Sequence, residues 1–196
     1  MNNDSLCNDI RYFQMYLKEL LTDYEMNEAI CDFYENDKSK FMKFGTCLGN
    51  ISEALCYRQH MLCYLLFYKD KDSKSIPRLL NRIKDTKLLQ NKKLDEAIKY
   101  LANEVNLLLQ NANTDIVNIK EYRHNVYAHW NVNSFNKEWR KQFREKHLFD
   151  YEKIIELTRK CLETFEVILS LLDRNSYVNP KVSLGHIELL INSLKM

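Results

Sequence analysis

The scarcity of glycine and proline most constrains the fold of this chain. Only three glycines and two prolines occur in 196 residues, while leucine, lysine and glutamate are abundant. Few helix-breaking residues among many that favour helices predict long helices joined by few breaks. The length suits one well-packed core and gives no reason to expect a second domain.

Apolar residues recur at steps of three and four, as one buried face of a helix requires. The first stripe follows Asp4 or Ser5, either of which can cap a helix, and a shorter amphipathic piece precedes a turn at Asn36-Asp37. Further stripes predict helices at about 39–67, 77–83, 92–111 and 149–172, and a short helix at 181–195. No strand alternation or internal repeat is present. We therefore expect one all-α domain over residues 1–196, with a core bundle at about 5–174.

Local signals refine these helices. Ser75 is expected to cap the helix that has Pro77 in its first turn. Asn113 or Thr114 is expected to cap a further helix, which begins beside them and leads into residues 122–130. Gly45 and Gly49, four residues apart, either allow another helix to approach closely or merely weaken their own helix.

The net charge of +2, from 29 basic and 27 acidic residues, means that any nucleic-acid affinity must come from local clustering. The six cysteines form no C-x-x-C pair, so free buried thiols are expected rather than a disulfide framework or zinc site. No signal peptide or membrane-length apolar run is apparent, which favours a soluble cytoplasmic protein. No phosphate-binding glycine loop or His-Glu-x-x-His helix occurs, so we expect no metal and no cofactor.

The richest chemical motif lies within residues 122–130. Arg123 is permanently cationic and can fork onto phosphate oxygens, whereas His129 can exchange a proton near neutral pH. On an unbroken helix the two differ by about 240° net and about 9 Å of rise, so they would not face each other. Asn125 and His129 would share a face. The pair forms one site only if the helix ends between them or a second copy supplies the complement, as in a two-fold dimer.

The alternative is a helix C-terminus at which His124 and His129 meet the helix dipole and Arg123 forms an ordinary ion pair. Residue types alone leave both interpretations open.

Arg123-His124-x4-His129 resembles the Arg-(Asn/Asp/His)-x4-His signature of HEPN domains, and Ala128-His129-Trp130 resembles their abortive-infection AbiU-type branch. Upstream segments resemble the helix, charged turn and next helix of that branch, in the same order: Leu55 to Arg58, Leu65 to Asp72, and Ser75 to Leu80. The similarity covers roughly Phe41 to Trp130.

The resemblance implies a helical bundle that dimerises and, in many members, a metal-independent endoribonuclease in the dimer cleft. Arg123 would hold the scissile phosphate of an RNA substrate, His129 would transfer protons, and His124 would orient the site. Attack by the RNA 2′-hydroxyl would leave a 2′,3′-cyclic phosphate and a 5′-hydroxyl. Such proteins act as toxins or in abortive infection, an antiviral defence.

Some HEPN toxins carry a tyrosine two residues after the histidine, which a partner nucleotidyltransferase modifies. This chain has Asn131 there and shows no Gly-Ser plus paired-aspartate pattern of such a transferase, so an antitoxin would have to be a separate protein, or absent.

Basic and aromatic residues alternate just after the motif, within residues 137–147. Lys137, Arg140, Lys141 and Arg144 could steer single-stranded RNA while Trp139 and Phe143 stack on its bases. Alternatively, this is a solvated amphipathic helix whose two aromatic residues pack inward.

Three other polar residues interrupt apolar stretches. Arg58 could line the cleft for RNA, or pair with Glu53 or a more distant carboxylate, while His60 and His186 are expected to be structural.

Two functions remain. The first is the homodimeric HEPN ribonuclease. The second is a non-catalytic HEPN-type module that binds RNA, a nucleotide or a protein partner, with its arginine and histidine used for binding or dimer packing.

Overall fold

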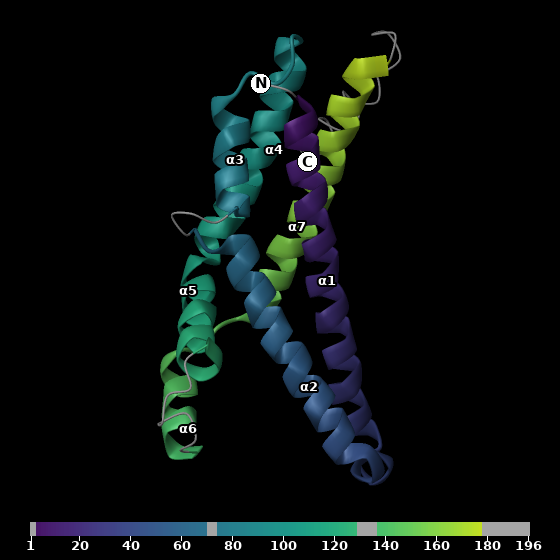
Figure 1. Ribbon diagram of the computed structural model, residues 1–196, viewed down its shortest axis with the longest axis vertical. Helices are drawn as coiled ribbons and strands as arrows, with labels where there is room; N and C mark the ends of the chain where they lie inside the picture. The colour runs from purple at the N-terminus through teal and green to yellow at the C-terminus, as the bar shows by residue number, and fades with distance from the viewer. Residues whose placement is uncertain (1–2, 70–73, 129–136, 178–196) are drawn as a thin grey trace.

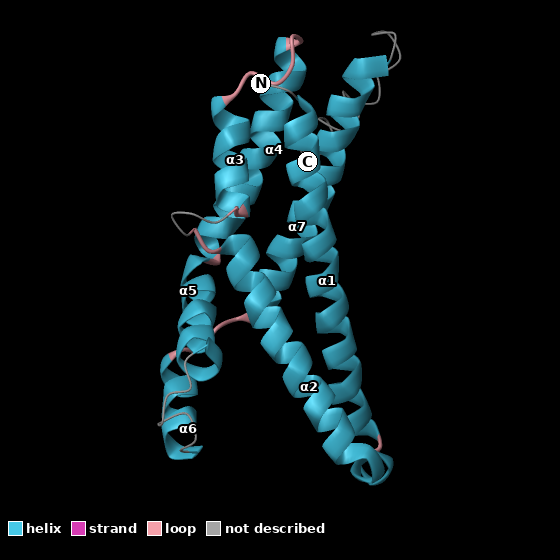
Figure 2. Ribbon diagram, viewed as in Figure 1, coloured by secondary structure: helices cyan, strands magenta, loops and turns pink. Residues whose placement is uncertain are grey.

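The computed structural model describes residues 3–69, 74–128 and 137–177 and contains helices alone within these ranges. Seven α-helices and one π-helical turn follow one another in the described chain (Figures 1 and 2): α1 (Asn3–Asn36), α2 (Lys38–Phe67), α3 (Ile76–Asp85), α4 (Lys92–Asn111), α5 (Asn113–Tyr122), η1 (Arg123–Ala128), α6 (Lys137–Lys146) and α7 (Tyr151–Tyr177). The all-α expectation is confirmed. The short helix predicted at 181–195 and His186 lie outside the described residues.

The long helices α1 and α2 form an antiparallel hairpin, and α7 packs against α1 (Figure 1). The sequence predicted two pieces before Asn36, but α1 is one helix of 34 residues. Only Asp37 separates it from α2, and the Asp37 backbone N–H still donates to the Phe33 carbonyl at 3.0 Å. Because no glycine or proline lies between residues 3 and 36, nothing in the chain requires an earlier break.

The core lies where α1, α2, α3, α4 and α7 meet. Every residue of the first predicted stripe is buried, with exposed fractions of at most 2%: Leu6, Ile10, Phe13, Leu17 and Leu20. Phe67, Ile83, Ile98 and Phe165 join them with 1% or less of their surface exposed. These long stripes therefore face one continuous core, as the three- and four-residue spacing predicted.

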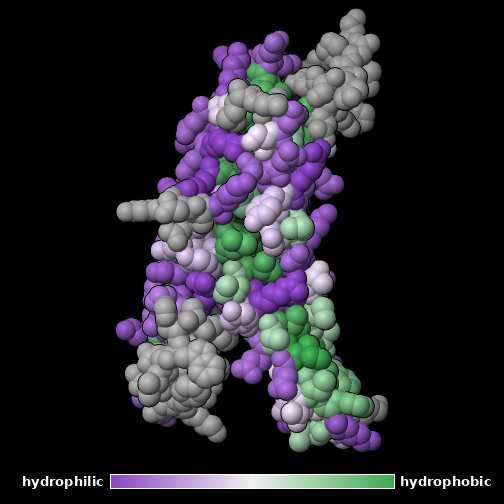
Figure 3. Space-filling view, viewed as in Figure 1, coloured by the Kyte–Doolittle hydropathy of each residue, from purple (hydrophilic) through white to green (hydrophobic). Residues whose placement is uncertain are grey.

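The stripe expected on α2 is buried only in its second half. Phe44 is 62% exposed and Ile51 is 40% exposed, whereas Leu62 and Leu66 are buried. In Figure 1 the first half of α2 runs alongside α1 away from the other helices, so no third helix of the described residues covers it. Figure 3 shows hydrophobic surface at this end of the hairpin.

The same exposed position explains two further results. Nothing lies within 4 Å of a Cβ placed at Gly49, so Gly49 makes no close helix approach within the described chain. All six cysteines are free thiols, as expected, but Cys31 and Cys47 are exposed rather than buried because they lie on the same hairpin.

Of the two predicted helix caps, one is confirmed in its position and the other is wrong. Ser75 stands at the N-cap of α3, but its hydroxyl makes no capping hydrogen bond. Helix α5 is preceded by Ala112, so neither Asn113 nor Thr114 caps it. The backbone ladder continues through Ala112, whose N–H donates to the Leu108 carbonyl at 2.9 Å and whose carbonyl accepts from the Ile116 N–H at 3.0 Å. A continuous ladder leaves little for a side-chain cap to satisfy.

The segment between α6 and α7 is attached to α5. Asn118 Nδ2 donates to the Leu148 carbonyl at 2.6 Å, and the Asp150 N–H donates to Asp115 Oδ1 at 2.7 Å. Asp115 is 8% exposed and also lies 3.9 Å from Lys153 Nζ on α7. These polar contacts, with buried Ile116 and Ile119, fix α5 and the motif at its end against the bundle.

Candidate functional site at the end of α5

The motif begins where α5 changes its helical geometry. Helix α5 ends at Tyr122, and residues Arg123 to Ala128 form a π-helical turn, η1. π-Helical turns hydrogen-bond across five residues instead of four, are rare, and occur frequently at functional sites. The wider turn changes which side chains share a face, so the α-helical geometry assumed from the sequence does not hold after Tyr122.

Arg123 is held against α2 by two contacts. Its guanidinium carbon lies 4.3 Å from the centre of the Tyr64 ring, and its Nε lies 2.8 Å from Met61 Sδ. Among the described residues, Arg123 has no carboxylate partner, which differs from the ordinary ion pair of the alternative interpretation. A guanidinium stacked on a ring keeps its charge and its outward N–H groups for another anion.

Asn125 and His124 lie on the same turn but differ in their surroundings. Asn125 Nδ2 donates back to the Glu121 carbonyl at 2.9 Å and lies 3.4 Å from Glu121 Oε2. His124 is exposed, and its charge acts on the same Glu121 carboxylate. Asn125 therefore supports the turn itself, while a direct role for either residue in binding or catalysis stays a prediction.

Glu121 is a carboxylate beside the motif that the sequence did not single out. The Lys120 ammonium, 3.0 Å away, lowers the pKa of Glu121 despite the opposing effect of burial, and His124 and His147 act in the same direction. The same contact raises the pKa of Lys120, whose Nζ lies 5.2 Å from the Tyr68 ring centre. A carboxylate that stays ionised here can orient the neighbouring histidines.

His129, the expected proton-transfer residue, lies outside the described residues. The side chains of Val126 and Tyr127 lie outside them as well. The structure therefore describes the arginine end of the motif and its support from α2, and a shared site of Arg123 and His129 stays a prediction.

The guanidinium of Arg58 contacts α1 instead of the motif. Its Nη2 lies 2.9 Å from Glu19 Oε2, and its Nε lies 3.1 Å from Asp23 Oδ2, both on α1. Of the alternatives left open by the sequence, pairing with a distant carboxylate is the one that the structure shows. An RNA-binding role for Arg58 would require these contacts to be exchanged.

Helix α6 bears the basic and aromatic cluster. Trp139 and Phe143 stack with ring centres 4.9 Å apart, and Phe143 also stacks on His147 at 4.3 Å and lies 6.1 Å from Tyr122 of α5. This packing favours the amphipathic-helix interpretation for the two aromatic residues. Lys141 is exposed, whereas the side chains of Lys137, Arg140 and Arg144 lie outside the described set.

A cavity of about 480 Å³ lies beside Tyr122, between α1, α2, α5 and the segment before α7. Its lining includes Gln59, His60, His147 and Phe149. Gln59 is 3% exposed, and its Nε2 has no hydrogen-bond partner among the described residues. The volume lies in the range of small-ligand pockets, and the lining combines aromatic rings with a buried amide. Gln59 could not be recognised from the sequence, because a single polar residue on a helix belongs to no motif.

The described residues contain no group of three histidine, cysteine or acidic side chains that could hold a metal ion. Within the same ranges, no helix combines the length and apolar character needed to cross a membrane.

Comparison with models of protein families assigns the chain to a family. The model of the HEPN_AbiU2 family, described as AbiU2, matches residues 11–189, a range that contains the whole motif. The chain belongs to the AbiU2 family of HEPN domains. No curated protein and no solved structure matches it significantly. The HEPN resemblance seen in the sequence is thus confirmed for this AbiU2-family chain and extends well beyond Phe41 to Trp130.

Proposed function

We propose that this AbiU2-family protein is a metal-independent endoribonuclease that acts as a homodimer, as a toxin or in abortive infection. Arg123 holds and neutralises the scissile phosphate, and His129 transfers protons. The 2′-hydroxyl attacks the adjacent phosphorus, the bond to the 5′-oxygen breaks, and that oxygen takes up a proton. The products carry a 2′,3′-cyclic phosphate and a 5′-hydroxyl.

The state of Arg123 carries this proposal. Its guanidinium is positioned by Tyr64 and Met61 of α2, and no carboxylate of the described chain neutralises it. A fixed, uncompensated cation stabilises the charge that develops on phosphate oxygens without reorganising during the reaction. Proton transfer by a histidine typically contributes a further factor of about 10²–10⁴ in rate.

The cavity beside Tyr122 supports the proposal that the substrate is RNA. A base can lie against its aromatic lining, and the buried Gln59 amide can hydrogen-bond to an edge of that base. Stacking on aromatic residues tolerates every base, whereas an amide adds preference for one hydrogen-bonding edge. We place a nucleotide next to the scissile phosphate in this cavity.

The exposed hydrophobic surface of the α1–α2 hairpin supports a homodimer. Met42 and Phe44 of α2 are 72% and 62% exposed, and Ile51 is 40% exposed (Figure 3). Clustered exposed apolar side chains mark interaction surfaces, and α2 is also the helix that positions Arg123. A second copy held by this helix can bring its own motif to the cleft.

The deciding experiment is cleavage of mixed cellular RNA by purified protein in excess EDTA. We expect the parent to produce cyclic-phosphate ends, and Arg123→Ala and His129→Ala each to lose at least about 100-fold of the rate. Arg159→Ala, an exposed arginine on α7, is the matched control and should cut like the parent. Circular dichroism checks that each variant keeps its helices.

Equal cleavage by the parent and the His129→Ala variant would contradict the proposal. RNA that binds the parent, is not cut, and binds both motif variants more weakly would instead identify the non-catalytic binding module.

A further inference from the structure

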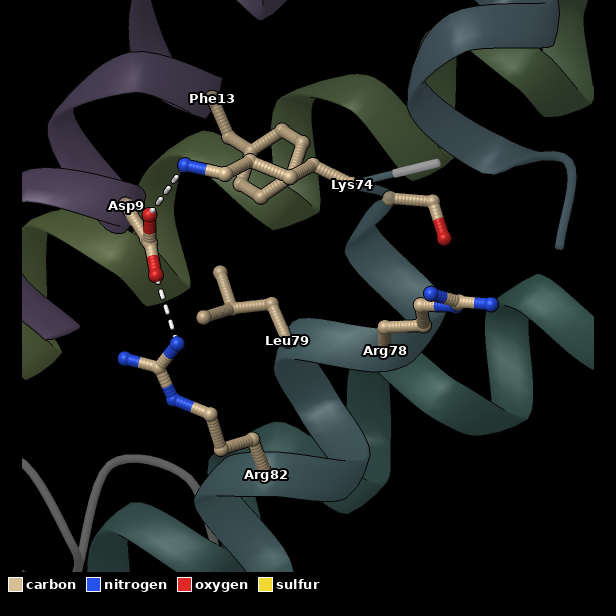
Figure 4. A pocket seen from close by; sticks show the side chains of 7 residues that line it. Asp9, Phe13, Lys74, Arg78, Leu79 and Arg82 are labelled. Carbon is tan, nitrogen blue, oxygen red and sulfur yellow. Dashed lines mark hydrogen bonds and ion pairs between the residues drawn. The ribbon is translucent and has the colours of Figure 1, made fainter. Parts of the chain in front are cut away.

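A second cluster of basic side chains surrounds a cavity where α3 begins, next to α1 (Figure 4). The cavity has a volume of about 220 Å³ and is lined by Asp9, Phe13, Lys74, Ser75, Arg78, Leu79 and Arg82. Figure 1 places α3 beside α4 near the start of the chain, whereas the motif follows the far end of α5. This cluster is therefore separate from the proposed ribonuclease site.

The charges of the lining do not balance. Among the described residues that line the cavity, Asp9 is the one carboxylate, and its two oxygens are engaged by Lys74 Nζ at 3.2 Å and Arg82 Nη1 at 2.6 Å. Arg78 lies one helical turn before Arg82 on α3, and Figure 4 shows its guanidinium turned away from Asp9 and Arg82. The described lining thus carries three cationic side chains and one anion, which leaves two positive charges in excess.

Several buried donors at this cavity also lack partners. Ser75 is 1% exposed, and its hydroxyl has no hydrogen-bond partner in the described part of the chain. The same holds for two buried nitrogens of Arg82, Nε and Nη2. Buried polar groups in native proteins are nearly always hydrogen-bonded, so each such atom calls for an acceptor. Every group concerned can donate, as the ligation of an oxyanion requires.

We propose that this pocket binds a phosphomonoester group. Such a group carries about −1.5 to −2 charge at pH 7, which matches the excess of two positive charges. Arginine guanidinium groups fork onto phosphate oxygens, and the Ser75 hydroxyl completes the donor set. The volume is below the roughly 300–1,000 Å³ of pockets that enclose a small ligand. The pocket thus takes the phosphate, and the remainder of the ligand projects outward.

Binding at this place joins α1 to α3. Asp9 and Phe13 belong to α1, whereas Arg78 and Arg82 belong to α3. A ligand that binds only the folded state stabilises it, so the phosphate should raise the melting temperature. The phosphomonoester loses its second proton near pH 6, so the effect should be larger at pH 7.5 than at pH 5.

The test is thermal unfolding of the full chain at constant ionic strength. The probes are inorganic phosphate, uridine 5′-monophosphate, and an RNA oligonucleotide with either a 5′-phosphate or a 5′-hydroxyl. At a hundredfold excess over Kd we expect a rise of about 5 °C at pH 7.5. A rise with the two small probes identifies a free phosphate compound as the ligand, whereas a rise only with 5′-phosphorylated RNA identifies an RNA end.

Arg78→Gln should reduce the affinity for the effective probe at least tenfold. Because Arg78 has no carboxylate partner among the described residues, this variant should fold like the parent. Arg159→Gln on α7 is the matched control and should respond like the parent. The proposal would be overturned if no probe raised the melting temperature, or if chloride raised it as much as phosphate. An Arg78→Gln variant that responds like the parent would overturn it as well. RNA cleavage, measured separately, does not enter this outcome.

Discussion

At the scale of single residues, Arg123 of the motif depends on Tyr64, a residue that belongs to no sequence motif. Tyr64 lies 59 positions before Arg123 in the chain, yet its ring supports the guanidinium at 4.3 Å. The sequence predicted Arg123 as the phosphate ligand but could not predict what holds it. Arginine stacked on an aromatic ring loses less freedom on binding, because its planar group is already oriented.

Removing the Tyr64 ring should therefore weaken phosphate binding without unfolding the protein. Cation–π contacts contribute about 0.5–2 kcal/mol, so Tyr64→Leu should lower RNA cleavage by a factor of about 2–30. Tyr64→Phe keeps the ring and should cleave at nearly the parental rate. Single-turnover kinetics on a short RNA measures the difference, and equal losses in both variants would show that the hydroxyl group matters instead of the ring.

Asp95 provides a pH-dependent test of stability. The buried carboxylate accepts from the Leu88 and Leu89 N–H groups at 2.7 and 3.1 Å and lies 3.0 Å from Lys99 Nζ. Burial alone would raise the pKa of Asp95, but the Lys99 ammonium and these N–H groups together lower it below its ordinary value. Because the folded-state pKa is below the unfolded one, the ionised carboxylate stabilises the protein above about pH 4 and loses this effect as the pH falls.

We expect Asp95→Asn to lower the free energy of unfolding by about 1 kcal/mol at pH 7, since a charged acceptor is replaced by a neutral one. The difference from the parent should stay constant from pH 7 to about pH 5 and shrink as the pH falls from there to about pH 3. Urea unfolding across this range measures it, with exposed Glu96→Gln as the control. A difference that stays constant with pH would exclude the carboxylate charge as the cause.

At the scale of elements, α5 carries the motif and depends on its neighbours for its position. It has only 10 residues, which is too short for independent stability, and it continues α4 through buried Ala112. Its apolar face packs on the bundle, and its polar side chains Asp115 and Asn118 hold the segment before α7. The position of Arg123 thus follows from tertiary contacts of α5.

Truncating the apolar face of α5 should destabilise the whole domain. Ile119 is fully buried, and Ile119→Ala should cost about 2–5 kcal/mol of unfolding free energy. Val117, which is 37% exposed on the same helix, is the matched control, and Val117→Ala should cost less than about 0.5 kcal/mol. Similar costs at the two positions in urea unfolding would contradict the packing of α5 described above.

At the scale of the whole molecule, the α1–α2 hairpin extends past its neighbours and exposes apolar side chains (Figure 1). Phe44 and Ile51 belong to the apolar stripe that predicted the helix at about 39–67, and their spacing matches a buried helix face. Spacing cannot distinguish a stripe that faces the core from one that faces a second molecule.

If this surface joins two copies, a charge placed on it should separate them. Phe44→Glu should shift the protein from dimer to monomer at micromolar concentration, as measured by light scattering. Leu107→Glu, at a 47% exposed position on α4, should leave the dimer intact. A parent that is monomeric at these concentrations would exclude the composite site, and a Phe44→Glu dimer would place the interface elsewhere.

The sequence by itself determined the all-α fold, most of the helices, and the arginine of the motif. Helix formation depends on near neighbours, and few glycines or prolines oppose it here, so local patterns carry the necessary information. Family membership could also be predicted, because the motif and its upstream segments keep their order along the chain.

Only the tertiary structure decided the partners of these residues. Arg58 pairs with α1, Arg123 stacks on α2, and Arg82 of α3 pairs with a carboxylate of α1. The burial of each stripe was decided in the same way, because α2 extends beyond the helices that could cover it. Each of these contacts joins residues far apart in the chain, and which helices meet is set by packing the entire bundle.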